Sequence, residues 1–139
     1  MAATHGQKKS DREVTDFCAE VLERTELLAR ANEPAGGLSL LGRKRLELAR
    51  AMATGPKVLL LDEIAGGLTE GECAALVGTI RGVLATGVTV IWIEHVLHAL
   101  NAVVERLVVL DFGRVIAMGA PAEVMASREV REIYLGIEV

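Results

Sequence analysis

The sequence is poor in the residues that mark disulfide-rich, nucleic-acid-binding and membrane-spanning proteins. Among its 139 residues are two cysteines, Cys18 and Cys73, which lack the spacing of a zinc site or of a disulfide framework. Aromatic residues make up 3% of the chain and the net charge is −4, a composition that argues against nucleic-acid binding as the main activity. The longest apolar stretches, 58–61 and 88–93, are far shorter than the roughly 18–20 residues of a membrane-spanning helix.

What the sequence does contain is apolar side chains, mainly those of alanine, valine and leucine. They make up 51% of the residues, which excludes a disordered chain, and the length suits one domain. No segment has the charged, apolar and small-residue layout of a signal peptide. These features predict a reduced, soluble, cytoplasmic domain. The mean hydropathy of +0.37 is nevertheless high for a soluble chain of this length.

Hydrophobic spacing and turn residues predict an α/β fold. Residues 1–12 are polar and without periodicity, and we expect a loose terminus there. Helices are predicted over 13–31, 41–54, 69–85 and 96–104, strands over 58–61, 88–93, 107–110 and 115–118, and a last pair of short helices up to about residue 134. Thr69 and Glu72 have the spacing of a capping box at the start of the third helix. This alternation implies a mainly parallel sheet with an antiparallel hairpin at its end.

The clearest candidate site is the acid pair that follows the strand at 58–61. Asp62 and Glu63 emerge at the carboxyl end of that strand, where ligand sites of parallel sheets lie. Mg²⁺ binds one or two carboxylates together with phosphate oxygens, which suits Asp62. Glu63 could orient or deprotonate a water molecule that attacks a phosphoryl group. The alternative is that the two acids form only a polar turn.

Two further segments have candidate anion-binding groups. His95 follows the strand at 88–93, so its imidazole should lie at the same edge of the sheet as Asp62 and could donate to a phosphate oxygen. Ser39 lies at a predicted helix N-terminus, where backbone N–H groups and the helix dipole favour an anion. Taken separately, the histidine could be a solvent-facing side chain and the serine an ordinary N-cap. His5 and His98 are assigned no role.

In this order, the three segments resemble the C-terminal half of an ATP-binding cassette (ABC) ATPase. The resemblance runs from about Val14 to the end of the chain and includes the signature segment 38–42, the Walker B strand 58–63, the D-loop region 66–70 and the switch histidine, His95. The tail at 113–124 is similar to the hairpin and helix that close such domains. The stretches RKRLELARA, LLLDEIAGGL and IEHV are most similar to ATP-binding subunits of branched-chain amino acid importers.

The resemblance implies a domain organisation and a set of roles. Residues 1–12 would be disordered, 13–54 would form a helical signature subdomain, and 55–139 would form the C-terminal part of the P-loop ATPase core. Asp62 would hold Mg²⁺ through water, Glu63 would be the general base, and His95 would sense the γ-phosphate of ATP.

The resemblance also implies that the signature segment acts on a second subunit. Ser39 and the backbone around Leu41 and Gly42 would close over ATP bound to the opposing subunit. The segment reads LSLLG where the family has LSGGQ, so two leucines replace glycines that let backbone approach phosphate. Contact between subunits could therefore be looser, or shifted onto Ser39 and the helix N-terminus. Ile64 replaces the usual proline and Thr69 the usual D-loop aspartate, which argues against direct coupling between the subunits at that place.

The largest departure from the family is the absence of G-x-x-x-x-G-K-[ST], the Walker A loop that binds the β- and γ-phosphates. The adenine platform and the glutamine loop are also missing. We therefore expect a truncated cassette that binds ATP weakly or not at all by itself and is inactive alone. Strands that lack their neighbours would explain the high hydropathy, and they predict self-association unless a partner covers them.

The expected partners are a second ABC ATPase subunit, identical or different, and membrane permease subunits. No nucleic acid and no direct membrane insertion are expected, and the chain would lie at the cytoplasmic face of the membrane, held there by the permease. Two other functions are compatible with the motifs. The chain could belong to a non-transport ABC ATPase, or it could be a non-catalytic interaction module that pairs with a full cassette.

Overall fold

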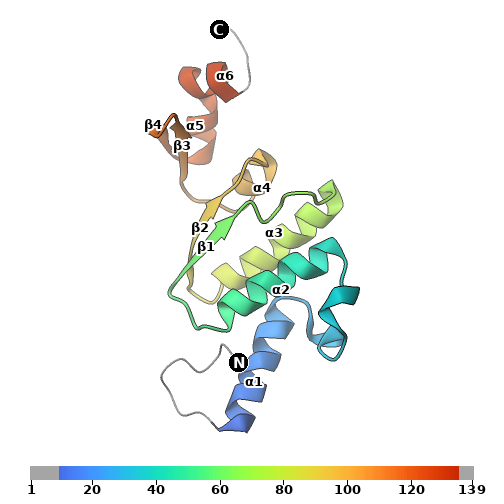
Figure 1. The fold of residues 1–139 in the computed structure, drawn as a ribbon. Coiled ribbons are helices and arrows are strands. Elements are labelled where there is room, and N and C mark those ends of the chain that lie inside the picture. Colours follow the sequence, from blue (N-terminus) through green and yellow to red (C-terminus); the bar gives the residue numbers. More distant parts are fainter. Residues whose placement is uncertain (1–9, 135–139) are drawn as a thin grey trace. The chain divides into compact units, whose positions relative to one another are not determined.

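The computed structural model describes residues 10–134 and divides the chain into two compact units, Met1–Leu100 and Asn101–Val139 (Figure 1). The elements of the first unit are α1 (Asp11–Arg24), the short 3₁₀ helices η1 (Leu28–Arg30) and η2 (Ala35–Gly37), α2 (Leu40–Met52), β1 (Val58–Asp62), α3 (Glu70–Leu84), β2 (Thr89–Ile93) and α4 (Leu97–Asn101), which ends at the division between the units. The second unit contains β3 (Leu107–Asp111), β4 (Arg114–Gly119), α5 (Pro121–Ala126) and α6 (Arg128–Tyr134). Residues 1–9 of the predicted loose terminus lie outside the described residues.

Helix α1 begins and ends earlier than its apolar spacing predicts. Ser10 caps it in a capping box with Glu13, so residues 10–12 belong to the cap and the first turn of the helix. At the other end, Glu26 has a left-handed backbone with φ 57°, and Leu27 N–H donates to the carbonyl of Leu22. This hydrogen-bond pattern is a Schellman motif, which ends the helix although the apolar residues continue beyond it.

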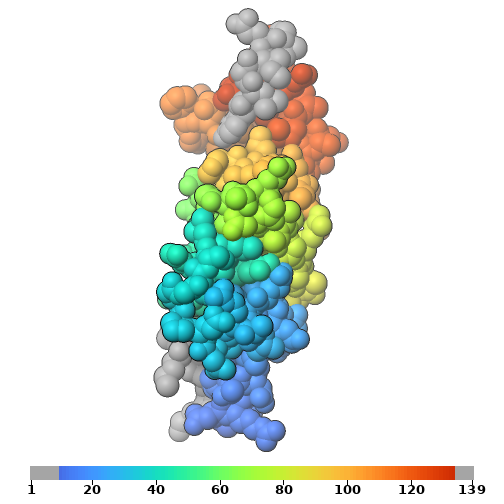
Figure 2. Space-filling view, turned by 90° about the vertical axis from the view of Figure 1, so that its right-hand side faces the viewer, coloured from blue at the N-terminus to red at the C-terminus, as the bar shows by residue number. Residues whose placement is uncertain are grey.

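Three helices pack together in the first unit. α1, α2 and α3 contact one another pairwise, and their most deeply buried side chains include Val21, Leu48, Leu76, Ile80 and Val83. The predicted capping box at the start of α3 is confirmed, because Thr69 and Glu72 each accept a hydrogen bond from the other's backbone N–H. Residues 31–37, between α1 and α2, are exposed, and the cyan part of Figure 2 shows this connection at the surface.

Strands β1 and β2 form a parallel pair in which Val58 lies opposite Thr89 and Asp62 opposite Ile93. Figure 1 shows α3 running alongside these two strands. In β1, Leu59 and Leu61 are buried, whereas Leu60 is 72% exposed. One face of the pair is therefore packed. The other face presents Val58, Leu60, Ile91 and Ile93, and we call these four residues the open apolar face.

In the second unit, β3 and β4 form an antiparallel hairpin with an irregularity at Val109/Leu110, and α5 and α6 pack against it. The connecting residues Phe112 and Gly113 have φ values of 41° and 77°, as in the type I′ turns that favour hairpins. Between residues 10 and 134, no helix combines the length and the apolarity needed to span a bilayer. The predicted domain boundary after residue 54 stays a prediction.

Candidate functional site at the carboxyl ends of β1 and β2

The parallel pairing of β1 and β2 brings the predicted residues Asp62, Glu63 and His95 to one edge of the sheet. Asp62 is the last residue of β1, and the backbone N–H of Glu63 donates to the carbonyl of Ile93, the last residue of β2, at 2.9 Å. Glu63 has φ 45°, a left-handed conformation that costs energy in a residue with a side chain. The chain therefore turns sharply just where the acid pair leaves the strand.

The side chains of Glu63 and His95 approach each other across this edge. The distance from Nδ1 of His95 to Oε1 of Glu63 is 3.8 Å, and both side chains are 66% exposed. Asp62 is exposed as well. A carboxylate and an imidazole that are both open to solvent and close together can orient a water molecule and contact an anionic group at the same time.

Glu94 also belongs to this edge, although sequence reasoning assigned it no role. Its side chain is fully buried. One carboxylate oxygen, Oε2, accepts a hydrogen bond from the backbone N–H of Ala65 at 2.9 Å, and the other, Oε1, accepts from the backbone N–H of His95 at 3.0 Å and of Val96 at 3.4 Å. Its position directly before a strand-end histidine was the one signal that the sequence offered.

Cys73 of α3 lies in the electrostatic field of this buried carboxylate. Burial raises the pKa of the Cys73 thiol, and the negative charges of Glu94 and Glu70 raise it further. Because only the thiolate is strongly nucleophilic, Cys73 is an inert packing residue at neutral pH.

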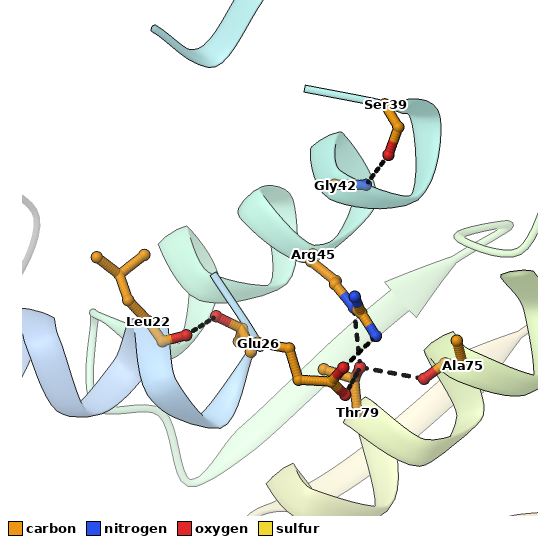
Figure 3. A network of polar contacts seen from close by, with 8 residues as sticks. Leu22, Glu26, Ser39, Gly42, Arg45, Ala75 and Thr79 are labelled. Carbon is orange, nitrogen blue, oxygen red and sulfur yellow. Dashed lines mark hydrogen bonds and ion pairs between the residues drawn. The ribbon is translucent and has the colours of Figure 1, made fainter. Parts of the chain in front are cut away.

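The other predicted group, Ser39, Leu41 and Gly42, lies at the N-terminus of α2. Ser39 is exposed and caps the helix, and its Oγ accepts a hydrogen bond from the backbone N–H of Gly42 at 3.2 Å (Figure 3). Gly42 is buried, and a Cβ placed there would meet Cβ of Leu38 at 3.2 Å. Leu41 is half-buried.

Comparisons with known proteins find relatives among ATP-binding proteins of ABC transporters. A family model described as "Branched-chain amino acid ATP-binding cassette transporter" matches residues 114–139. The chain is 36% identical over 132 residues to the high-affinity branched-chain amino acid transport ATP-binding protein BraF of Pseudomonas aeruginosa, an alignment that covers 93% of this chain and 51% of BraF. It is 34% identical over 139 residues to LivG of Escherichia coli, a protein with the same description, with 98% of this chain and 54% of LivG covered.

A solved structure, the ADP conformation of an ATP-binding cassette of an ABC transporter, superimposes with a TM-score of 0.83 at 28% identity, covering 96% of this chain and 54% of that one. The chain is similar in sequence and in fold to ATP-binding subunits of ABC transporters. It spans about half the length of the curated relatives that it matches. The expected fold, the C-terminal part of an ABC ATPase core with a helical part, is confirmed.

The segment LSLLG, predicted to be the signature, lies against the turn that follows β1. A Cβ placed on Gly67 would meet Cδ2 of Leu40 at 3.3 Å, so the first of the two leucines in this segment borders the predicted D-loop region. Gly67 has φ 78°, a conformation that glycine adopts without strain.

A network of polar side chains connects α2 with its neighbours (Figure 3). Arg45 of α2 binds Glu26, which follows α1, at 2.5 Å, and its Nε donates to Oγ1 of Thr79 in α3 at 3.2 Å. The hydroxyl of Thr79 donates to the other oxygen of Glu26 at 2.9 Å. Sequence reasoning missed this triad because its members lie far apart in the chain: Arg45 is 19 residues from Glu26 and 34 residues from Thr79.

The residues at the β1–β2 edge suit Mg²⁺ only if oxygen ligands from another molecule complete the coordination. No group of three or more histidine, cysteine, aspartate or glutamate side chains is placed to hold a metal ion in the described part of the chain. Mg²⁺ in nucleotide sites takes one or two protein carboxylates, and phosphate oxygens and water supply the rest. The exposed carboxylate of Asp62 suits that arrangement.

Proposed function

We propose that this chain supplies the C-terminal half of the ATP-hydrolysing subunit of an ABC importer for branched-chain or related amino acids. The observation that carries the proposal is the meeting of Asp62, Glu63 and His95 at one sheet edge, with Glu63 and His95 3.8 Å apart. The names of BraF and LivG support the importer class and its substrate.

In this function each residue has a distinct task. Asp62 would hold Mg²⁺ through water, and the ion would supply positive charge against the phosphates of ATP. Glu63 orients the attacking water and accepts its proton. His95 donates a hydrogen bond to the γ-phosphate. Ser39 and the backbone of Leu41 and Gly42 contact ATP that is bound to a second ATPase subunit.

The 139 residues contain no Walker A loop, and we propose that a phosphate-binding half outside these residues completes the site. We propose that this half covers the open apolar face and that the chain by itself binds ATP weakly and self-associates. The completed subunit would dimerise and would be held at the cytoplasmic face of the membrane by permease subunits.

A hybrid protein tests the proposal. The C-terminal half of Escherichia coli LivG is replaced by this whole chain, and ATP hydrolysis by the purified hybrid and branched-chain amino acid uptake in cells without LivG are measured. We expect ATP hydrolysis that Glu63→Gln lowers by about 10²- to 10⁴-fold, the usual contribution of a general base. Glu47→Gln, which changes an exposed carboxylate of α2, is the matched control and should retain activity.

Three results would contradict parts of this proposal. A hybrid that folds but does not hydrolyse ATP would refute the assignment of the site. Activity that survives Glu63→Gln would refute the role of Glu63 as the base. Micromolar ATP affinity of the chain alone would refute the need for a separate phosphate-binding half.

A further inference from the structure

We propose that Glu94 is the positioning residue of this site: its buried carboxylate fixes the turn after Glu63 relative to the turn that carries His95. This inference rests on the proposed function for its effect on catalysis, whereas the placement itself depends only on the contacts of Glu94. Glu94 would then act through its two neighbours and would not touch ATP.

The contacts of Glu94 reach both turns. Its Oε2 accepts a hydrogen bond from the backbone N–H of Ala65, which lies two residues after Glu63. Its Oε1 accepts a hydrogen bond from the backbone N–H of His95. The carbonyl of Glu63 accepts the N–H of Gly66 in the same turn. One side chain of β2 therefore anchors the segment that leaves β1, in addition to the hydrogen bonds between the strands.

The imidazole of His95 lies between two carboxylates. Its Nδ1 is 3.3 Å from Oε1 of Glu94 and 3.8 Å from Oε1 of Glu63. Both oxygens can accept a hydrogen bond from Nδ1 when that nitrogen carries a proton. Glu94 therefore lies beside the imidazole ring as well as accepting the backbone N–H of His95.

The strained backbone of Glu63 makes such an anchor necessary. A residue other than glycine with φ 45° persists only when its surroundings over-determine it. Glu94 contributes to this by binding Ala65, and its carboxylate is buried where water cannot replace a lost partner. Loss of the carboxylate would let the turn relax and would move Glu63 away from His95.

The first test uses the whole chain and measures amide hydrogen exchange by NMR. In Glu94→Ala, we expect the amides of Ala65, His95 and Val96 to exchange at least about tenfold faster, because each loses its acceptor. Glu94→Gln keeps the volume and one carbonyl oxygen, so it should release one of the two turns. Glu72→Gln is the matched control, because Glu72 also accepts a backbone N–H but at the N-terminus of α3. Unchanged exchange at Ala65 and His95 in both Glu94 variants would overturn the proposal.

The second test measures catalysis in the LivG hybrid. Glu94→Ala should lower kcat by about 10- to 100-fold with KM for ATP unchanged, as expected when a reacting group is misplaced. In a background that carries both Glu63→Gln and His95→Ala, the same change should cost little more, because Glu94 would act through these two residues. Fully multiplicative losses would overturn the positioning role. If the unmodified hybrid is inactive, the proposed function fails, and hydrogen exchange alone decides whether Glu94 fixes the two turns.

Discussion

Replacing Thr79 by valine tests whether the Arg45–Glu26–Thr79 triad holds the signature helix α2 in place. Valine has nearly the shape of threonine, so packing is preserved while the hydroxyl is lost. Thr79 is 2% exposed, and its hydroxyl accepts from Arg45 and shares its one proton between Glu26 and the carbonyl of Ala75. The substitution therefore removes the hydrogen bonds of one buried group without creating a cavity.

The expected cost follows from what remains after the substitution. The carboxylate of Glu26 is about half exposed and can exchange its lost partner for water, whereas the side chain of Arg45 is only 14% exposed. An unsatisfied, largely buried donor costs about 1–3 kcal/mol. We therefore expect the free energy of unfolding to fall by about 2 kcal/mol.

Urea denaturation followed by tryptophan fluorescence measures this change. Trp92 is the single tryptophan of the chain and lies in β2, in the same compact unit as the triad. The midpoint should shift without a change in m value. The control is Thr86→Val, which removes only a hydroxyl bond to the carbonyl of Val83 and should cost less than about 0.5 kcal/mol. A loss below about 0.5 kcal/mol for Thr79→Val would refute the reasoning.

Three further changes have expected outcomes. Hydrogen bonds from Thr69 lower the pKa of Glu72, so the stabilising effect of its carboxylate is present at neutral pH and is lost as the pH falls through the folded-state pKa. Urea midpoints of Glu72→Gln and wild type should therefore differ at pH 7 and converge once the pH is below that lowered pKa. Phe112→Asn should stabilise the hairpin by about 0.5 kcal/mol in thermal unfolding, because Phe112 is 99% exposed at φ 41° and asparagine tolerates that conformation; a destabilised variant would contradict this. Gly67→Ala should lower the urea midpoint by the equivalent of about 1–2 kcal/mol, since φ is 78° and the new Cβ would crowd Leu40; an unchanged midpoint would show that the turn relaxes freely.

The parts of the fold that local sequence determines were predictable. The capping box of Thr69 and Glu72 involves residues three apart, and β1 and β2 are short apolar runs bounded by turn residues. The end of α1 was not predictable in this way, because Leu27 continues the apolar spacing. The backbone reverses at Glu26, whose side chain is held by residues of α2 and α3. Glycine usually occupies the left-handed position that ends a helix, and because Glu26 is not a glycine, the local sequence does not mark the end of α1.

For the candidate site, the position of its residues at one sheet edge was predictable, whereas the burial of Glu94 was not. Placing Asp62 and His95 at one edge required only that both follow parallel strands, and the register confirms that they do. Their catalytic roles remain predictions. The burial of Glu94 could not be inferred, because an acid at the end of a strand normally faces water. It is buried here because the turn containing Ala65, 29 residues earlier, supplies a backbone N–H to it.

The open apolar face connects the composition of the chain with its proposed incompleteness. Strands without polar alternation are typical of sheets covered on both faces, yet β1 and β2 leave Val58, Leu60, Ile91 and Ile93 between 51% and 72% exposed. Fully burying a side chain of this size contributes about 1.5–3 kcal/mol, and these are already partly covered, so a layer on this face would contribute roughly 4–8 kcal/mol. That is comparable to the whole stability of a small domain. The high mean hydropathy of +0.37 therefore includes a surface suited to a covering layer.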